Sequence, residues 1–369
     1  MKKNKLIIFM PSVEDGGVEK NFFLISNYLA KKFADISIIS ISNKIKSKLD
    51  PNINLISLKS GFYDNLGRRK KFFICLFLLL KEIMFKRNNV VFCFQGNIYC
   101  TLLCKLFFTK VIIRSNTSPS GWSKSFLKVF FYKKFYGLAD KIIVNSTEFK
   151  KEFKKKLNLK SICIYNPLNK QEIIKKSNQK IRFKFFSKET LNLICIARLS
   201  DQKDHHCFLK AINFLKNKVK LKVLFIGNGQ KLEEMQTYIK KKKLLKIINI
   251  IPFKKNPFPY LKKSDALVLS SKFEGLPNVL LEALTLKKLV ICSNCPTGPK
   301  EILDYGKGGL LFKTGHTQDL VKKIIYLSKN KKICKKKTIY GYNRLYRFKE
   351  EVSLYKFFEL LSNFQIKLK

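Results

Sequence analysis

The sequence predicts an α/β protein made of two doubly wound domains, each built around a parallel sheet. Short apolar runs of strand length alternate with longer helical patterns along the whole chain, which is typical of parallel sheets covered by helices. This alternation of strands and helices is interrupted at Pro167, and a second series of strands begins at residue 191. The 369 residues are enough for two domains that each have their own core.

The first domain is expected to span residues 1–167. Its strands are predicted at residues 6–10, 36–41, 54–58, 90–94, 111–114 and 142–145, with helices at 18–31 and 72–86 among those between them. The segment 168–190 is rich in lysine and has no regular pattern, so we predict a linker there.

The second domain is expected to span residues 191–346. Its strands are predicted at residues 191–197, 222–226, 247–251, 266–269, 290–293 and 309–312. Residues 347–369 form an amphipathic pattern with Phe and Leu on one face, which predicts a final helix. Because doubly wound sheets bind ligands at the carboxyl ends of their strands, functional residues are expected directly after strands.

The formal charge of +50 suggests a polyanionic partner, nucleic acid among them. Only eight of the 75 basic residues are arginine, however, and the lysines are spread over the whole chain rather than gathered in one arm. We therefore favour a solvated lysine surface without nucleic acid as a partner, and an anionic membrane surface fits the charge better. A basic protein that binds nucleic acid or a membrane and keeps an inactive cleft remains the alternative.

Apolar runs and cysteines both favour a cytoplasmic protein. The longest apolar run, residues 72–80, is far shorter than the roughly 20 residues that a transmembrane helix needs. Residues 6–10 are apolar but fit a first strand better than a secretory signal. Most of the ten cysteines lie in apolar segments, which is typical of reduced, buried thiols. Cys292 and Cys295 have no second pair or histidine near them, so no metal site is expected.

Residues 270–282 are the most informative segment of the chain. Glu274 and Glu282 stand on either side of a Gly-Leu-Pro-Asn turn that leads into an apolar helix. Proline suits the first turn of a helix, and the free amides of residues 278–280 would form a site for phosphate. Glu274 would face a sugar, and Glu282 would bind hydroxyl groups near the phosphate. The pattern predicts a nucleotide-sugar pocket that also includes Gly275, Leu276, Pro277, Asn278 and Val279.

Three further motifs accompany this segment, in a fixed order along the chain. They are Gly16-Gly17-Val18-Glu19, residues 196–204 (Ile-Ala-Arg-Leu-Ser-Asp-Gln-Lys-Asp) and Pro296-Thr297-Gly298-Pro299. Together the four resemble the retaining glycosyltransferases of family 4, which have a Glu-x7-Glu motif. The resemblance implies the GT-B fold, in which two Rossmann-like domains face each other across a cleft and a C-terminal helix crosses back to the first domain. The last motif resembles a subgroup that builds bacterial polysaccharide, O-antigen and lipid-linked oligosaccharide.

The resemblance also implies a mechanism without metal, cofactor or protein nucleophile, in which the acceptor attacks the face of the sugar that the diphosphate leaves. Fixed cations then have to stabilise the departing diphosphate. Arg198 and Lys203 match the family's phosphate-binding pair: arginine offers a planar fork to two oxygens and lysine a point charge. With Glu274 against the sugar, they are the predicted catalytic residues. Glu282 would point to the ribose, so the two glutamates are not expected to act as a glycosidase pair.

Further donor contacts are predicted in loops that follow strands. Gly16 and Gly17 would let the backbone approach the donor phosphate at the start of a helix. Gly227 and Phe253 lie where relatives line the base, although ordinary turn chemistry explains them equally well.

A histidine that reaches the donor sugar in many relatives has no counterpart here. The three histidines, His205, His206 and His316, all lie in the second half of the chain. Asn116 lies at the expected place and can bind a sugar hydroxyl, but it cannot titrate. His205 and His206 are adjacent, so on a helix they point about 100° apart and make a poor metal pair. Both are expected at the surface.

Residues 68–87 and 122–136 mix basic and aromatic side chains, Trp122 among them, which suits helices that lie on an anionic bilayer. For 68–87 a core helix with lysines reaching into solvent fits equally well. The expected function is transfer of a hexose or N-acetylhexosamine from a UDP-sugar to a lipid-linked or polysaccharide acceptor at the cytoplasmic face of the membrane. GDP-mannose is the alternative donor.

Overall fold

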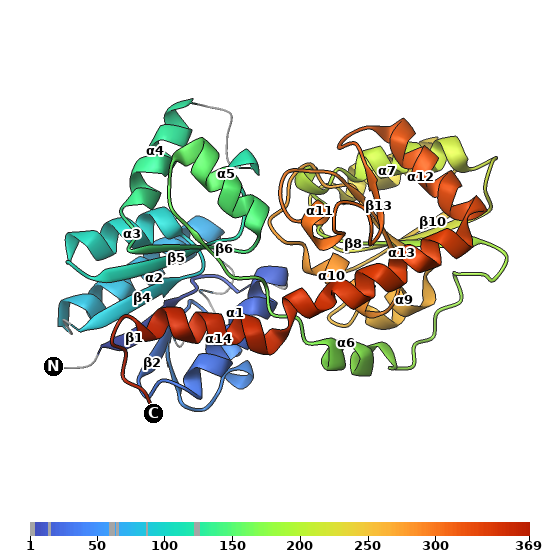
Figure 1. Cartoon of the computed structure of the whole chain (residues 1–369). Coiled ribbons are helices and arrows are strands. Elements are labelled where there is room, and N and C mark those ends of the chain that lie inside the picture. Colours follow the sequence, from blue (N-terminus) through green and yellow to red (C-terminus); the bar gives the residue numbers. More distant parts are fainter. Residues whose placement is uncertain (1–3, 14–15, 59–62, 64–65, 86–87, 122–125) are drawn as a thin grey trace. The chain divides into compact units, whose positions relative to one another are not determined.

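The computed structural model describes all residues except 1–3, 14–15, 59–62, 64–65, 86–87 and 122–125. The chain divides into two compact units (Figure 1). The first unit consists of Met1–Pro167 together with Glu350–Lys369, and the second consists of Leu168–Lys349. The C-terminal helix therefore returns to the N-terminal half of the chain, and it begins at Glu350 rather than at residue 347.

The first unit is built around a seven-stranded parallel sheet in the order β3-β2-β1-β4-β5-β6-β7. Its strands are β1 (Lys5–Phe9), β2 (Ile36–Ile39), β3 (Ile53–Ile56), β4 (Asn89–Cys93), β5 (Lys110–Ser115), β6 (Lys141–Val144) and β7 (Ile162–Cys163). The central strands β1 and β4 are buried along their whole lengths, because helices cover both faces of a parallel sheet. Alternation along β1 places Leu6 and Ile8 in one core and Ile7 and Phe9 in the other.

The helices of the first unit form two layers. They are α1 (Gly17–Ala30) and α14 (Glu350–Ser362) on one face, and α2 (Arg68–Phe85), α3 (Asn97–Leu106), α4 (Phe126–Gly137) and α5 (Thr147–Leu157) on the other. Ring contacts hold α14 in place: the centroid of Phe357 lies 6.0 Å from that of Phe92, and that of Phe358 lies 5.4 Å from that of Phe33. The apolar face predicted for the tail is thus buried in the first core.

The second unit has a six-stranded parallel sheet in the order β10-β9-β8-β11-β12-β13. Its strands are β8 (Leu191–Ile196), β9 (Leu221–Ile226), β10 (Ile248–Ile251), β11 (Ala266–Leu269), β12 (Leu289–Ser293) and β13 (Leu310–Phe312). Its helices are α6 (Lys170–Ser177), α7 (His205–Leu215), α8 (Leu232–Lys241), α9 (Phe258–Lys263), α10 (Asn278–Thr285), α11 (Pro299–Ile302), α12 (Thr317–Lys329) and α13 (Lys331–Asn343). Both units are doubly wound, as the sequence predicts.

The segment 168–190 differs from the predicted linker. It contains helix α6, which begins where the side chain of Asn169 accepts a hydrogen bond from the Glu172 N–H at 2.9 Å. Helix α6 contacts α9 and α10, so the segment belongs to the second unit. The helix was not predicted because its lysines mask the short apolar pattern to which the buried Ile173 belongs.

The structure also shows the state of the cysteines and the apolar character of the helices. All ten cysteines are free, and all except Cys163 are buried. Among the helices of the described residues, none is both long and apolar enough to cross a bilayer.

Candidate active site

The predicted catalytic residues come together at the point where the strand order of the second sheet reverses. Strand β8 lies between β9 and β11, so the chain moves from β8 to one side of the sheet and later returns to the other side at β11. Loops that leave neighbouring strands at such a point diverge and leave room for a ligand. Arg198 and Lys203 follow β8, and Glu274 follows β11.

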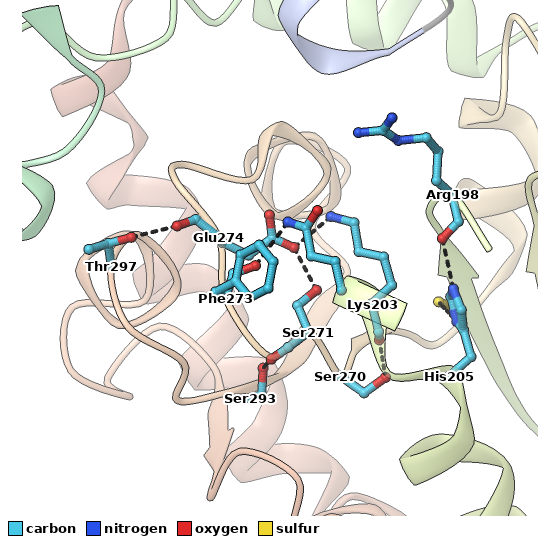
Figure 2. Close-up of polar contacts among 11 residues, drawn as sticks. Arg198, Lys203, His205, Ser270, Ser271, Phe273, Glu274, Ser293 and Thr297 are labelled. Carbon is cyan, nitrogen blue, oxygen red and sulfur yellow. Dashed lines mark hydrogen bonds and ion pairs between the residues drawn. The ribbon is translucent and has the colours of Figure 1, made fainter. Parts of the chain in front are cut away.

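Lys203 and Glu274 form an ion pair, with 2.6 Å between Nζ and Oε1 (Figure 2). Ser271 Oγ donates to the same Oε1 at 2.5 Å. The Glu274 side chain is only 7% exposed and that of Lys203 15%, so water screens the pair little. No hydrogen bond from the described residues reaches Glu274 Oε2, which leaves one carboxylate oxygen for a ligand.

Arg198 is exposed, and its guanidinium makes no hydrogen bond or ion pair with the described residues. Figure 2 shows its side chain extending away from its own backbone carbonyl. Among the described residues, hydrogen bonds therefore fix the backbone of Arg198 but not its side chain. An unpaired guanidinium beside a lysine–glutamate pair can receive an anion such as phosphate.

The loops that carry Lys203 and Glu274 are tied together by contacts that the sequence did not suggest. Gln202 Nε2 donates to the Phe273 carbonyl at 3.0 Å, and the Lys272 N–H donates to the Gln202 carbonyl at 2.8 Å. Ser270 Oγ lies 2.9 Å from the carbonyl of Lys203. These contacts fix the relative positions of Lys203 and Glu274. Gln202 belongs to the 196–204 motif, and that is the one signal that could have singled it out.

The Pro-Thr-Gly-Pro motif supports the Glu274 loop from the other side. Thr297 Oγ1 donates to the Glu274 carbonyl at 2.6 Å. Gly298 has a φ of +81°, and a Cβ there would lie 2.0 Å from the Gly275 carbonyl oxygen. Glycine is thus required at 298 by both conformation and space. The motif acts here through the backbone of the loop that carries Glu274.

Helix α10 begins directly after Pro277, as predicted, but one of its expected phosphate donors is occupied. The Leu280 N–H donates to the Pro277 carbonyl at 3.1 Å, because the first turn of the helix tightens there. Asn278 and Val279 are the first two residues of the helix. Glu282 lies one turn further and is buried, with 7% of its surface exposed.

Gly227 and Gly229 pack against the loop of Arg198. A Cβ on Gly227 would lie 2.0 Å from the Ala197 carbonyl oxygen, and one on Gly229 would lie 2.2 Å from that of Leu199. The Leu199 N–H also donates to the Asn228 carbonyl at 2.8 Å. Gly227 therefore supports the backbone beside Arg198. Asn228 Oδ1 in turn accepts from the Phe253 N–H at 3.0 Å, and the Phe253 side chain is 41% exposed.

This packing gives a testable expectation for Gly227→Ala. The added methyl group has to displace the backbone at Ala197, and φ at this position is +159°, which alanine rarely adopts. We expect the free energy of unfolding to fall by about 1–3 kcal/mol, measured by urea denaturation. Gly67→Ala, whose Cβ would meet nothing within 4 Å, is the matched control. Equal stability of the two variants would contradict the close contact.

The donor residues predicted in the first half of the chain lie in the first unit. Gly16 is the extended residue before α1, and Gly17 is the first residue of that helix. Asn116 follows β5, and its amide is engaged: Oδ1 accepts from Arg114 Nη1 at 3.1 Å, and Nδ2 donates to the Phe94 carbonyl at 3.0 Å. Much of the hydrogen-bonding capacity of Asn116 is thus used inside the unit, which a comparison of motifs could not reveal.

Arg114 was not singled out from the sequence, yet it is fully buried. Its Nη2 donates to Asn166 Oδ1 at 2.6 Å, and its guanidinium carbon lies 5.5 Å from the ring centroid of Phe94 and 5.8 Å from that of Phe357. Burial lowers the pKa of Arg114 to about 10. Arg114 therefore connects the end of β5, helix α14 and the residue before Pro167.

The expectation that both adjacent histidines are surface residues is wrong for His205, which is only 3% exposed. It is the first residue of α7, and its ring lies against Phe225 of β9. His206 is partly exposed, with its ring edge against Tyr238. His316 caps helix α12 by accepting from the Asp319 N–H at 3.2 Å. In the part of the chain that the structure describes, no cluster of three or more potential metal ligands occurs.

Comparison with known proteins finds glycosyltransferases among the proteins that the chain resembles. Residues 177–344 match the family described as Glycosyl transferases group 1. The chain is 32% identical over 222 residues to an uncharacterized glycosyltransferase of Methanocaldococcus jannaschii, and this match covers 54% of the chain and 55% of the archaeal protein. The chain thus spans little more than half the length of that relative.

Two further proteins resemble the chain over most of its length. The N-acetylgalactosamine-N,N'-diacetylbacillosaminyl-diphospho-undecaprenol 4-alpha-N-acetylgalactosaminyltransferase of Campylobacter jejuni is 25% identical over 332 residues, with 86% of this chain and 88% of that protein covered. The crystal structure of Anabaena HepE with UDP and glucose aligns with a TM-score of 0.77 at 16% identity, covering 97% of this chain and 99% of that one. The chain therefore has the GT-B fold, and its residues 177–344 match the group 1 glycosyl transferases.

Proposed function

We propose that the protein is a retaining, metal-independent glycosyltransferase that moves a hexose or N-acetylhexosamine from a UDP-sugar to a lipid-linked or polysaccharide acceptor. One observation carries the proposal. The loops after β8 and β11 present two cations and one carboxylate with an open oxygen at the point where the strand order reverses. This is the charge pattern needed for a nucleotide diphosphate next to a sugar.

In the proposed reaction Arg198 and Lys203 hold the diphosphate of the donor. As the bond between the anomeric carbon and the phosphate oxygen breaks, their charges stabilise the negative charge that develops on the leaving group. The acceptor hydroxyl forms the new bond from the same face, and its proton passes to the departing phosphate oxygen. Glu274 Oε2 binds sugar hydroxyls and stabilises the positive charge at the anomeric carbon.

The remaining donor residues have supporting roles in this proposal. Glu282 binds the ribose, and the exposed ring of Phe253 supports the base beside Gly227. The start of α10 faces the diphosphate, where the helix dipole favours negative charge. The choice of UDP draws on the UDP bound to HepE, and that of a lipid-linked acceptor on the diphospho-undecaprenol named for the Campylobacter relative.

A transfer assay tests the proposal. The purified protein is incubated with labelled UDP-glucose, UDP-N-acetylglucosamine, UDP-N-acetylgalactosamine and GDP-mannose in the presence of bacterial membranes. We expect lipid-extractable label from a UDP-sugar, and an α-linked product from an α-linked donor by NMR. Folded protein that transfers no sugar from any donor would refute the enzyme, and a product of inverted configuration would refute the retaining mechanism.

The proposal includes binding to anionic lipid through the outer side of α2, α3 and α4. Helix α2 buries Cys75, Leu79 and Ile83, so part of it is a core helix, but its other side is apolar and exposed. Among the described side chains of these three helices, the exposed aromatic residues are Phe73 (67%), Phe77 (55%), Tyr99 (56%), Phe130 (52%) and Phe131 (51%). Helix α3 contacts both α2 and α4, so these rings belong to neighbouring helices of one layer. Trp122, which the sequence assigns to the same surface, lies outside the described residues.

Aromatic rings next to lysines suit the boundary between headgroups and acyl chains. Lys81 Nζ lies 4.6 Å from the ring centroid of Phe77, and the rings of Phe73 and Tyr99 are 6.5 Å apart. We expect the double substitution of Phe73 and Phe77 by serine to weaken binding to phosphatidylglycerol vesicles by about tenfold or more in sedimentation. Tyr355→Ser, an exposed aromatic on α14 at the opposite face of the sheet, is the control. Unchanged binding of the double variant would refute this surface.

A further inference from the structure

We infer that His205 is a positioning residue that fixes the backbone of Arg198 and thereby aims its guanidinium at the donor diphosphate. The inference rests on the proposed function, in which Arg198 binds that diphosphate. His205 belongs to helix α7 rather than to the preceding loop that carries Arg198 and Lys203. Its ring approaches the Arg198 carbonyl (Figure 2). Among the described residues, the His205 ring makes no hydrogen bond to Lys203 or Glu274.

The contacts of the ring determine its tautomer. His205 Nε2 lies 2.9 Å from the Arg198 carbonyl oxygen, and because a carbonyl only accepts, Nε2 carries the hydrogen. Nδ1 is then an acceptor, and it lies 3.7 Å from Cys195 Sγ. Burial raises the pKa of Cys195 to about 12, so this thiol keeps its proton and donates it. Burial also lowers the pKa of His205, which favours the neutral ring that this arrangement needs.

A tether at this carbonyl matters because the Arg198 guanidinium has no hydrogen bond or ion pair with any described residue. The Arg198 carbonyl also accepts from the Ser200 N–H at 3.0 Å, so two donors converge on one oxygen at the bend of the loop. On the other side, the Leu199 N–H is held by Asn228. Because these hydrogen bonds fix the backbone at residues 198 and 199, the Arg198 side chain starts from a defined position. Less conformational entropy is then lost when it binds a ligand.

Packing alone does not explain a histidine at this site. The ring meets Phe225 edge-on, with 5.8 Å between centroids, and a leucine or phenylalanine would fill a site that is 3% exposed without burying polar atoms. His206 offers a matched comparison on the same helix. Its ring makes no hydrogen bond with the described residues and lies 5.1 Å from the ring of Tyr238, measured between centroids.

The variants separate the hydrogen bond from the volume of the ring. In His205→Gln the amide N–H can replace Nε2–H, whereas His205→Leu fills the space without a donor, and His206→Leu is the control. With UDP as the probe in calorimetry, we expect His205→Leu to raise the dissociation constant about tenfold, the loss of one hydrogen bond. His205→Gln and His206→Leu should stay within about threefold of the unchanged protein. In an Arg198→Ala background His205→Leu should have no further effect, because its action passes through Arg198.

Hydrogen exchange gives a readout that needs no ligand. Amides of residues 198–203 should exchange faster in His205→Leu, but not in His205→Gln or His206→Leu. If the chain binds no nucleotide at all, the proposed function fails, while faster exchange confined to this loop still supports the tether. Unchanged exchange in His205→Leu overturns the inference. The inference is also overturned if His205→Leu lowers UDP affinity equally in the unchanged protein and in the Arg198→Ala background.

Burial of the neutral ring predicts a pH dependence, because it lowers the pKa of His205 more than the hydrogen bond to the Arg198 carbonyl raises it. The groups around the ring are Cys195 from β8 and Lys203 and Asp204 from the loop, and Lys203 adds to the effect of burial in lowering the pKa of His205 below its ordinary 6.5. The unfolded chain therefore takes up the proton first, so this contribution to stability is complete above pH 6.5 and is lost as the pH falls below it. His205→Gln should flatten the fall in melting temperature between pH 6.5 and 5. An equally steep fall in the variant overturns the assignment of a neutral, buried ring.

Discussion

Glu274→Gln is expected to lower the transfer rate by about a hundred- to a thousand-fold while the protein stays folded. The amide has the size of the carboxylate, and its oxygen can still accept from Lys203 and Ser271, which now share Oε1. The negative charge is lost, however, and with it the stabilisation of the positive charge that develops on the sugar. Because that charge develops only in the transition state, kcat should fall much more than the donor KM rises.

Initial rates at several donor concentrations test this, with far-UV circular dichroism to confirm the fold. Glu233→Gln makes the same change at an exposed glutamate on α8 and should leave the rate unchanged. Full activity of Glu274→Gln would contradict the assignment of Glu274 to the sugar.

Lys203→Met is expected to damage both stability and activity. It removes one partner of a buried ion pair and leaves the Glu274 carboxylate, only 7% exposed, with Ser271 as its remaining side-chain partner. Breaking a buried pair in this way costs about 3–5 kcal/mol, because the remaining charge stays buried without compensation. Transfer should fall by about a hundredfold as well, since one of the two cations for the diphosphate is gone.

The double variant Lys203→Met, Glu274→Gln separates the two effects. Removing the second charge should restore most of the free energy of unfolding, measured in urea, but none of the transfer activity. Lys231→Met is the control, because the ion pairs of Lys231 with Asp201 and Glu234 are exposed and contribute little. If Lys203→Met unfolds at the same urea concentration as this control, the Lys203–Glu274 pair is not the buried contact described here.

The fold could be predicted from local patterns because both sheets are parallel and buried on both faces. Such strands appear as short apolar runs, and twelve of the thirteen strands found among the described residues overlap a predicted range. The remaining strand, β7, is only two residues long. The pattern failed at α6, where lysines on the exposed face outnumber the buried residues of an eight-residue helix.

The meeting of the loops that carry Arg198, Lys203 and Glu274 was predictable for a similar reason. Arg198, Lys203 and Glu274 each follow a strand, and parallel strands bring their carboxyl ends to one edge of the sheet. A motif on each of two loops was therefore enough to predict that they meet. Whether Gly16 and Gly17 contribute to donor binding stays a prediction.

Local order along the chain thus defined the strands, the helix starts and the loops that carry the charges. Only packing between distant segments decided how each polar side chain is used. His205 and His206 are adjacent, yet one is buried against Arg198 and the other is partly exposed, because the sheet covers one side of α7. Asn116 resembles a ligand in sequence but hydrogen-bonds to Arg114, whose buried guanidinium also donates to the distant Asn166. Hydrogen bonds depend on which groups burial brings within about 3 Å of each other, and separation along the chain does not encode that distance.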